Sequence, residues 1–128
     1  GMVALLTRLQ AEGVALAVAS NKYQAATEKL VAHYFPTISF VKILGQREGI
    51  PTKPDPSIVN EIVAAAGVAK SDVLYVGDSN VDMQTAQNGG VDACGVTWGF
   101  RPKEELAAYH PALLAERPEE IAEWVLQK

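Results

Sequence analysis

At the start of the chain, the apolar residues follow first a helical pattern and then a strand pattern. Between residues 2 and 9 they recur at i, i+3, i+4 and i+7, which predicts a helix with one buried face, ended by Gly13. Residues 14–19 then form an apolar run that is too short for a helix. A run that is apolar on both faces is typical of a parallel strand covered by helices on both sides. Ser20 and Asn21 follow it as predicted N-caps of a second helix.

The same alternation continues to the end of the chain. Further strands are predicted at 40–44, 73–76 and 91–96, with a short edge strand at 112–115. Further helices are predicted at 58–66, at 80–88 and from residue 118 onward, and a loop rich in Gly and Pro at 45–54. Helices that connect successive strands predict an α/β fold, a three-layer Rossmann-like parallel sheet formed by one domain over residues 1–128. Ligands of such a sheet bind beyond the carboxyl ends of its strands.

Composition narrows the classes of function. With 11 basic and 15 acidic residues, the formal net charge is −4, so the chain lacks the basic surplus that binds nucleic acid or an anionic membrane. No apolar run approaches the roughly 20 residues that span a bilayer, and no segment reads as a signal peptide. We therefore expect a soluble, cytoplasmic protein. The single cysteine, Cys94, is expected to be a small buried hydrophobic residue.

Polar residues follow the predicted strands and the long loop. They are Ser20 with Asn21, Lys53, and Asp78 with Asp82. On the residues alone, the first pair reads as helix caps and Lys53 as a solvated loop lysine. Asp78 and Asp82 differ, because carboxylates at i and i+4 on the first turn of a helix repel each other unless a cation neutralises them.

A magnesium site accounts for this pair. Mg²⁺ takes oxygen ligands and uses only one or two protein carboxylates. A lysine, a hydroxyl and helix N-terminal amides beside such a metal would bind phosphate, so the residues predict a Mg²⁺-dependent phosphate site. Helix capping by Asp78 and Ser79 is the alternative, and it is compatible with metal binding.

The order of these residues is similar to that of a known family. Ser20, then Lys53 in Lys-Pro-Asp-Pro, then Gly-Asp-Ser-x-x-Asp over residues 77–82 resemble the second, third and fourth motifs of the haloacid dehalogenase-like hydrolase superfamily, in its phosphoglycolate-phosphatase-like branch. The resemblance covers nearly the whole chain and includes Thr-Trp-Gly-Phe-Arg at 97–101. Within that segment, Trp98 and Phe100 are expected to pack under a loop and Arg101 to be solvated.

The resemblance implies a role for each residue. Ser20 would hydrogen-bond a phosphoryl oxygen, and Asn21 would contribute its backbone amide. Lys53 would stabilise charge on the nucleophile and on the transferring phosphoryl group. Asp78 would ligate Mg²⁺ directly, and Asp82 would act through the metal shell or by orienting Lys53. The implied activity is hydrolysis of a small phosphorylated metabolite through an aspartyl phosphate.

One motif of the family is missing. None of the aspartates, at positions 55, 72, 78, 82 and 92, has another two residues away, so the Asp-x-Asp that supplies the family's nucleophile is absent. The resemblance places the missing strand between the strands that end at Ser20 and at Asp78, and it implies that the helical cap is absent too. Gly1-Met2 resembles the point where the chain re-enters the core. The chain is therefore expected to be the C-terminal part of a longer phosphatase. The alternative is that Gly1 is a cloning remnant in front of a start methionine, Met2.

Loss of this strand predicts two consequences. Without the nucleophile, the 128-residue chain is expected to be inactive and to bind Mg²⁺ more weakly. Unpaired strand edges are expected either to re-pair within the chain or to self-associate with a second copy. The alternative function, from another class, is a non-catalytic module that binds phosphate ligands or a partner protein.

Overall fold

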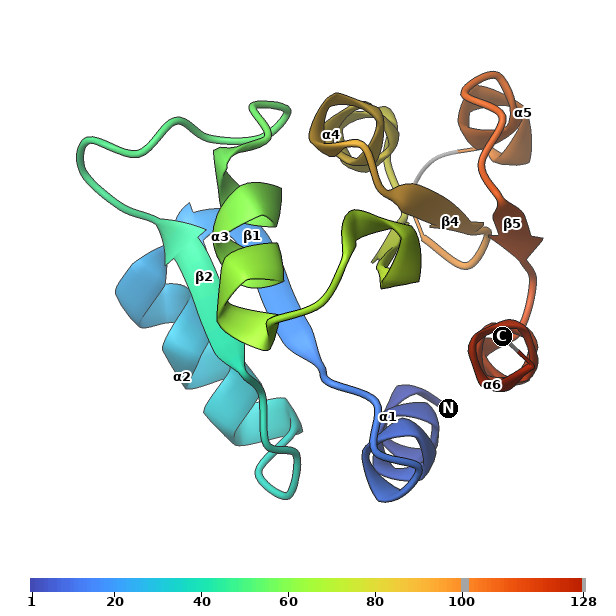
Figure 1. The fold of residues 1–128 in the computed structure, drawn as a ribbon, viewed down its shortest axis with the longest axis horizontal. Coiled ribbons are helices and arrows are strands. Elements are labelled where there is room, and N and C mark those ends of the chain that lie inside the picture. Colours follow the sequence, from blue (N-terminus) through green and yellow to red (C-terminus); the bar gives the residue numbers. More distant parts are fainter. Residues whose placement is uncertain (100–101, 128) are drawn as a thin grey trace.

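Helices and strands alternate along the chain in the computed structural model, which describes residues 1–99 and 102–127 (Figure 1). The helices are α1 (Met2–Ala11), α2 (Gln24–Tyr34), α3 (Ser57–Ala66), α4 (Asn80–Gly89), α5 (Lys103–Ala107) and α6 (Pro118–Leu126). The strands are β1 (Ala17–Tyr23), β2 (Lys42–Gln46), β3 (Leu74–Gly77), β4 (Asp92–Val96) and β5 (Leu113–Ala115). A short 3-10 helix, Lys70–Asp72, precedes β3. In the described part of the chain, no helix is both long and apolar enough to cross a membrane.

The strands form two separate parallel sheets. β1 pairs with β2, and β4 lies between β3 and β5 in the second sheet. Among the described residues no strand joins β1 to β3, so the gap expected between the strands that end at Ser20 and Asp78 is present. In residues 1–99 and 102–127, the edges of β1 and β3 do not re-pair with each other, which was one of the two outcomes expected for them. The α/β class with parallel strands is confirmed.

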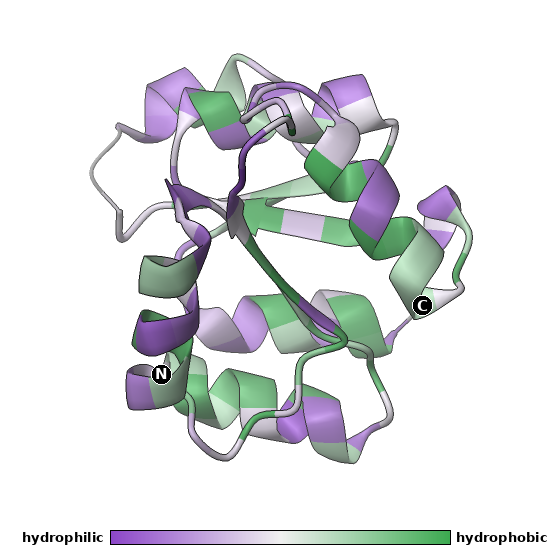
Figure 2. Ribbon diagram, turned by 90° about the vertical axis from the view of Figure 1, so that its left-hand side faces the viewer, coloured by the Kyte–Doolittle hydropathy of each residue, from purple (hydrophilic) through white to green (hydrophobic). Residues whose placement is uncertain are grey.

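Helices cover both faces of these strands and complete the three layers (Figure 2). On one face of β4 and β5, Leu9 of α1 and Ile121 of α6 share a buried cluster with Cys94. On the other face, Met83 of α4 and Leu106 of α5 are fully buried. Cys94 is itself fully buried, and burial raises the pKa of its thiol to about 11. The prediction of a small buried hydrophobic residue is therefore confirmed.

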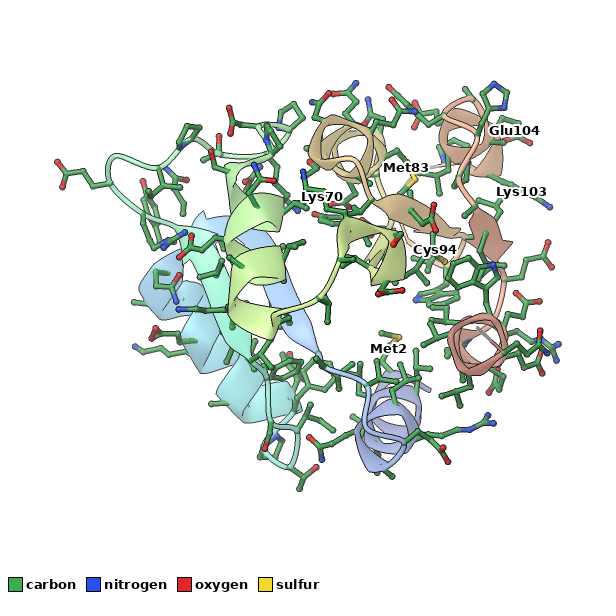
Figure 3. The ribbon with its side chains drawn as sticks, viewed as in Figure 1. Met2, Lys70, Met83, Cys94, Lys103 and Glu104 are labelled. Carbon is green, nitrogen blue, oxygen red and sulfur yellow. The ribbon has the colours of Figure 1, made fainter. Side chains whose placement is uncertain are left out.

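A cavity of about 650 Å³ lies between the two sheets. Its walls are apolar side chains of α1, α3 and α6 and the facing edges of β1 and β3, and Met2 points into it from α1 (Figure 3). Ala17 of β1 is exposed and Val76 of β3 is 39% exposed on this side. The expectation that the first strand is buried on both faces is therefore wrong, because no neighbouring strand covers this edge.

Several predicted element boundaries are also wrong. β1 begins at Ala17 rather than Val14 and continues to Tyr23 rather than ending at Ala19, and α2 begins at Gln24 without a side-chain cap. Ser20 and Asn21 are thus not helix caps. β2 begins at Lys42, two residues after the predicted start, and Phe40 packs edge-to-face on Phe35 before the strand begins.

Candidate phosphate and metal site

Lys53 and Asp82 form a buried ion pair at the carboxyl ends of β1 and β3. The Nζ atom of Lys53 lies 2.8 Å from Oδ1 of Asp82, and each side chain is 11% exposed. The same Nζ donates to the carbonyl of Ala19 in β1 at 3.4 Å. Because Asp82 belongs to α4, which packs on the second sheet, the pair links the two sheets across the opening. The structure therefore brings together two residues that the sequence separates by the whole of α3 and β3.

Four donors surround the carboxylate of Asp82. Its Oδ1 accepts from Lys53 and from the Tyr75 hydroxyl at 3.1 Å. Its Oδ2 accepts from the backbone amide of Asp78 at 3.2 Å and from the Ser79 hydroxyl at 3.0 Å. Burial acts to raise the pKa of Asp82, but the hydrogen bond and charge of Lys53, with the two hydroxyls, lower it overall. Asp82 therefore stays ionised, and its oxygens are occupied by protein donors.

Tyr75 also belongs to this site, although the apolar pattern of residues 73–76 predicts only its place in a strand. Burial, followed by the neighbouring Asp82 carboxylate, raises the pKa of its hydroxyl, so Tyr75 remains a hydrogen-bond donor. Its ring centroid lies 5.9 Å from Nζ of Lys53. The signal in the sequence was a residue with a polar tip two positions before Gly77 in an otherwise apolar strand.

Gly77 allows Asp82 to approach this closely. A Cβ atom at position 77 would lie 2.3 Å from Cβ of Asp82 and 2.5 Å from Oδ2, distances at which two atoms overlap. Only glycine leaves room for the carboxylate against β3. The Gly-Asp-Ser-x-x-Asp spacing thus has a packing reason as well as a chemical one.

Ser20 and Asn21 lie at the end of β1 beside the loop that carries Lys53. Oγ of Ser20 accepts from the backbone amide of Lys22 at 3.0 Å, and among the described residues its O–H donates to no partner. The side chain of Asn21 holds the backbone of Lys53: its Oδ1 accepts from the Lys53 amide at 3.0 Å and its Nδ2 donates to the Lys53 carbonyl at 3.4 Å. Asn21 therefore positions the backbone of Lys53 through its side chain.

The loop before α3 is anchored at both ends. Arg47 donates to both carboxylate oxygens of Glu61 in α3, at 3.0 and 2.6 Å. Asn88 of α4 donates to the carbonyl of Pro54 at 2.9 Å. The sequence carries no local signal for the first of these contacts, because Arg47 and Glu61 are 14 positions apart. Together the two contacts fix the loop that presents Lys53.

Asp78 precedes α4 instead of lying in its first turn. Ser79 is the N-cap, and its Oγ accepts from the Asp82 amide at 3.2 Å, so capping by Ser79 is confirmed. The argument that Asp78 and Asp82 need a cation because they share a helical turn is therefore wrong: Lys53 already neutralises Asp82. In the described part of the chain, the Asp78 carboxylate accepts no hydrogen bond, so it is free to act as a ligand.

At this site, the Asp78 carboxylate is therefore available to a metal ion. Among residues 1–99 and 102–127, no group of three or more His, Cys, Asp or Glu side chains could hold a metal ion. Mg²⁺ accepts such a site, because it retains several waters and takes one or two carboxylates together with substrate phosphate. Asp78 fits this requirement, whereas Asp82 is committed to its four donors.

The segment after β4 lies at the same edge. Trp98 is 43% exposed, so the expectation that it packs under a loop is wrong. Phe100 and Arg101, for which packing and solvation were expected, lie outside the described residues.

The strands are parallel, helices cover both of their faces, and a lysine–carboxylate pair lies where the strands end. This arrangement defines a Rossmann-like α/β protein whose site suits an anionic ligand. The family model for haloacid dehalogenase-like hydrolases matches residues 1–96. The chain belongs to this family.

Individual relatives agree with this assignment. The chain is 35% identical over 113 residues to a phosphoglycolate phosphatase of Rhodobacter capsulatus, covering 88% of this chain and 50% of that protein. A crystal structure from Lactobacillus delbrueckii subsp. bulgaricus, provisionally assigned as a phosphoglycolate phosphatase, has a TM-score of 0.91 at 37% identity and covers 98% of this chain and 52% of that one. A provisionally assigned haloacid dehalogenase-like hydrolase from Bacteroides fragilis has a TM-score of 0.85 at 29% identity, covering 92% of this chain and 56% of that one. The chain thus spans about half the length of the relatives it matches.

Proposed function

We propose that this chain is the phosphate- and metal-binding part of a Mg²⁺-dependent phosphatase that hydrolyses a small phosphomonoester through an aspartyl phosphate. The observation that carries the proposal is the buried Lys53–Asp82 pair at the carboxyl edge, 2.8 Å between Nζ and Oδ1, in a chain of the haloacid dehalogenase-like family. A cytoplasmic location belongs to the same proposal.

The residues at this edge would bind the phosphoryl group through complementary charge. The Ser20 hydroxyl and the Asn21 backbone amide would donate hydrogen bonds to phosphoryl oxygens. The Lys53 ammonium would offset negative charge that builds up during transfer. Asp82 holds this ammonium in place, and the low pKa of Asp82 keeps the ion pair charged at neutral pH.

Asp78 would be the protein ligand of Mg²⁺. When bound, the cation would neutralise charge on the substrate phosphate. Asp82 would serve the site by orienting Lys53, because its oxygens already accept from four protein donors. Of the two roles that the family resemblance implies for Asp82, we therefore propose the orientation of Lys53.

The nucleophile would come from a segment that these residues do not include. In the proposed reaction, a carboxylate oxygen of that aspartate attacks phosphorus while the bond to the leaving alcohol oxygen breaks, and this oxygen takes up a proton from solvent. Water then hydrolyses the aspartyl phosphate, which releases phosphate and restores the carboxylate. Lys53 cannot replace the nucleophile, since an ammonium group has no free electron pair. We therefore propose that the 128-residue chain alone is inactive.

Titration calorimetry with Mg²⁺ and then inorganic phosphate, combined with turnover of p-nitrophenyl phosphate, tests the proposal. We expect the chain to bind Mg²⁺ and then phosphate without measurable turnover. Asp78→Asn should weaken Mg²⁺ binding at least tenfold, and Lys53→Met should weaken phosphate binding by a similar factor. Asp72→Asn, at an exposed aspartate of the 3-10 helix, is the matched control and should change neither affinity. Equal Mg²⁺ affinity in the Asp78→Asn and Asp72→Asn proteins would contradict the metal assignment.

A non-catalytic binding module remains the competing function. The upstream reading frame separates the two: an Asp-x-Asp encoded before residue 1, in a longer chain that turns over p-nitrophenyl phosphate, would establish the enzyme. A longer chain that lacks this motif and still binds phosphate would establish the module.

A further inference from the structure

Gly99 lies directly against Asp78, although the two residues belong to different connections. β3 and β4 are parallel neighbours with Gly77 opposite Gly95, so the segments that leave them emerge at the same edge. The segment after β4 is tied to β5, because the Thr97 amide donates to the Ala115 carbonyl at 3.0 Å. This tie places Gly99 beside the side chain that follows β3.

The space between these residues excludes any side chain at position 99. A Cβ atom there would lie 2.3 Å from Cβ of Asp78, 2.4 Å from Oδ2 and 2.7 Å from Cγ. Rotation about χ1 would move the carboxylate but not Cβ, which is fixed to the backbone, so an alanine would displace the whole residue. The φ angle of Gly99 lies outside the left-handed region. Glycine is therefore required here for space and not for backbone conformation.

The two carboxylates of the site are held differently. Asp82 is fixed by four hydrogen-bond donors. Asp78 accepts no hydrogen bond from the described residues, so packing takes the place of hydrogen bonding. We infer that Gly99 is a positioning residue that sets the place of the Asp78 carboxylate and, through it, the Mg²⁺ affinity of the site. The metal part of this inference rests on the proposed function.

Mg²⁺ titration of Gly99→Ala tests the metal part. Loss of a residue that positions a metal ligand weakens metal binding by about 10- to 100-fold, and we expect a loss in this range. Gly95→Ala is the matched control in β4, because its Cβ would meet the flexible end of Leu114 at 2.9 Å, away from Asp78. It should crowd the core and leave Mg²⁺ affinity unchanged. Equal affinity in wild type and Gly99→Ala would overturn the inference while leaving Asp78 as the ligand.

A double-mutant cycle in urea tests the contact independently of metal. Gly99→Ala should lower the midpoint of unfolding in the wild-type background and have much less effect after Asp78→Gly, which removes the Cβ atom it would strike. Should Gly99→Ala fail to fold, recovery of folding in the double variant supports the contact. An equal effect in both backgrounds overturns it. If wild type and Asp78→Asn show the same Mg²⁺ affinity, the metal role of Asp78 and the metal part of this inference both fail, and the cycle alone decides the packing part.

Discussion

The ion pair of Lys53 and Asp82 illustrates how a buried charge is maintained. Removing two charges from water costs several kcal/mol each, and attraction between them offsets this only when their remaining donors and acceptors are satisfied. Asp82 meets the condition with the Tyr75 and Ser79 hydroxyls and a backbone amide. Removing one partner of such a pair therefore leaves the other charged, buried and partly unpaired.

Lys53→Met should lower the free energy of unfolding by about 3 kcal/mol at pH 7, because it leaves the Asp82 carboxylate without its cation. Urea denaturation measures this change. Lys103→Met is the matched control: Lys103 pairs with Glu116 at 3.1 Å, but the two side chains are 54% and 62% exposed. That change should cost about 0.5 kcal/mol or less. Similar losses in the two variants would show that the Lys53 pair does not behave as a buried one.

The same pair predicts a pH dependence. The pKa of Asp82 is lowered in the folded chain, so the pair stabilises the fold fully above the unfolded carboxyl pKa of about 3.9. This contribution is lost as the pH falls through the lower, folded pKa. The difference in unfolding free energy between wild type and Lys53→Met should therefore be largest near neutral pH and shrink below about pH 4. A difference that stays constant down to pH 2 would count against an ionised Asp82.

At the scale of elements, the sequence predicted what depends on local pattern. The helices at 2–11, 57–66 and 80–89 follow from apolar spacing and terminal glycines. The end of β1 could not be predicted, because the strand continues to Tyr23 through contacts with a distant loop: Asn21 bonds the backbone of Lys53. Propensity identified Asn21 as a cap, and a tertiary contact outweighed that preference.

The candidate site, too, could be predicted from the sequence only in part. The motif spacing identified Ser20, Lys53, Asp78 and Asp82. The role of Tyr75 and the space required at Gly99 could not be predicted, since both depend on side chains that meet only when β3, α4 and the segment after β4 are packed.

Ser79 is the N-cap of α4 and connects this helix to the site. Ser79→Ala should cost about 1 kcal/mol of unfolding free energy, as is usual for loss of an N-cap, because the Asp82 amide loses its acceptor at 3.2 Å. Ser79→Thr retains the hydroxyl and should recover most of this loss. Ser39→Ala is the matched control at an exposed serine, and it should stay within about 0.5 kcal/mol of wild type in urea denaturation. Equal stability of Ser79→Ala and Ser39→Ala would contradict capping by Ser79.

At the scale of the whole molecule, the two sheets have facing edges and no strand between them. Contacts between helices on either side, and the Lys53–Asp82 pair at the carboxyl edge, hold the halves together. The edges of β1 and β3 leave backbone groups without strand partners. An apolar cavity of about 650 Å³ beside such edges favours pairing with another extended segment.

We therefore expect the isolated chain to self-associate with increasing concentration, as measured by sedimentation velocity. Val76→Lys places a charge on the exposed edge of β3 and should keep the chain monomeric at concentrations where wild type associates. Val3→Lys is the matched control, because Val3 is 48% exposed on α1 but does not line the cavity; this variant should associate like wild type. Circular dichroism should show that both variants are folded, since each lysine replaces an exposed valine. A wild-type chain that remains a folded monomer throughout, or a Val76→Lys variant that associates as strongly as Val3→Lys, would show that the open edges do not recruit a second copy.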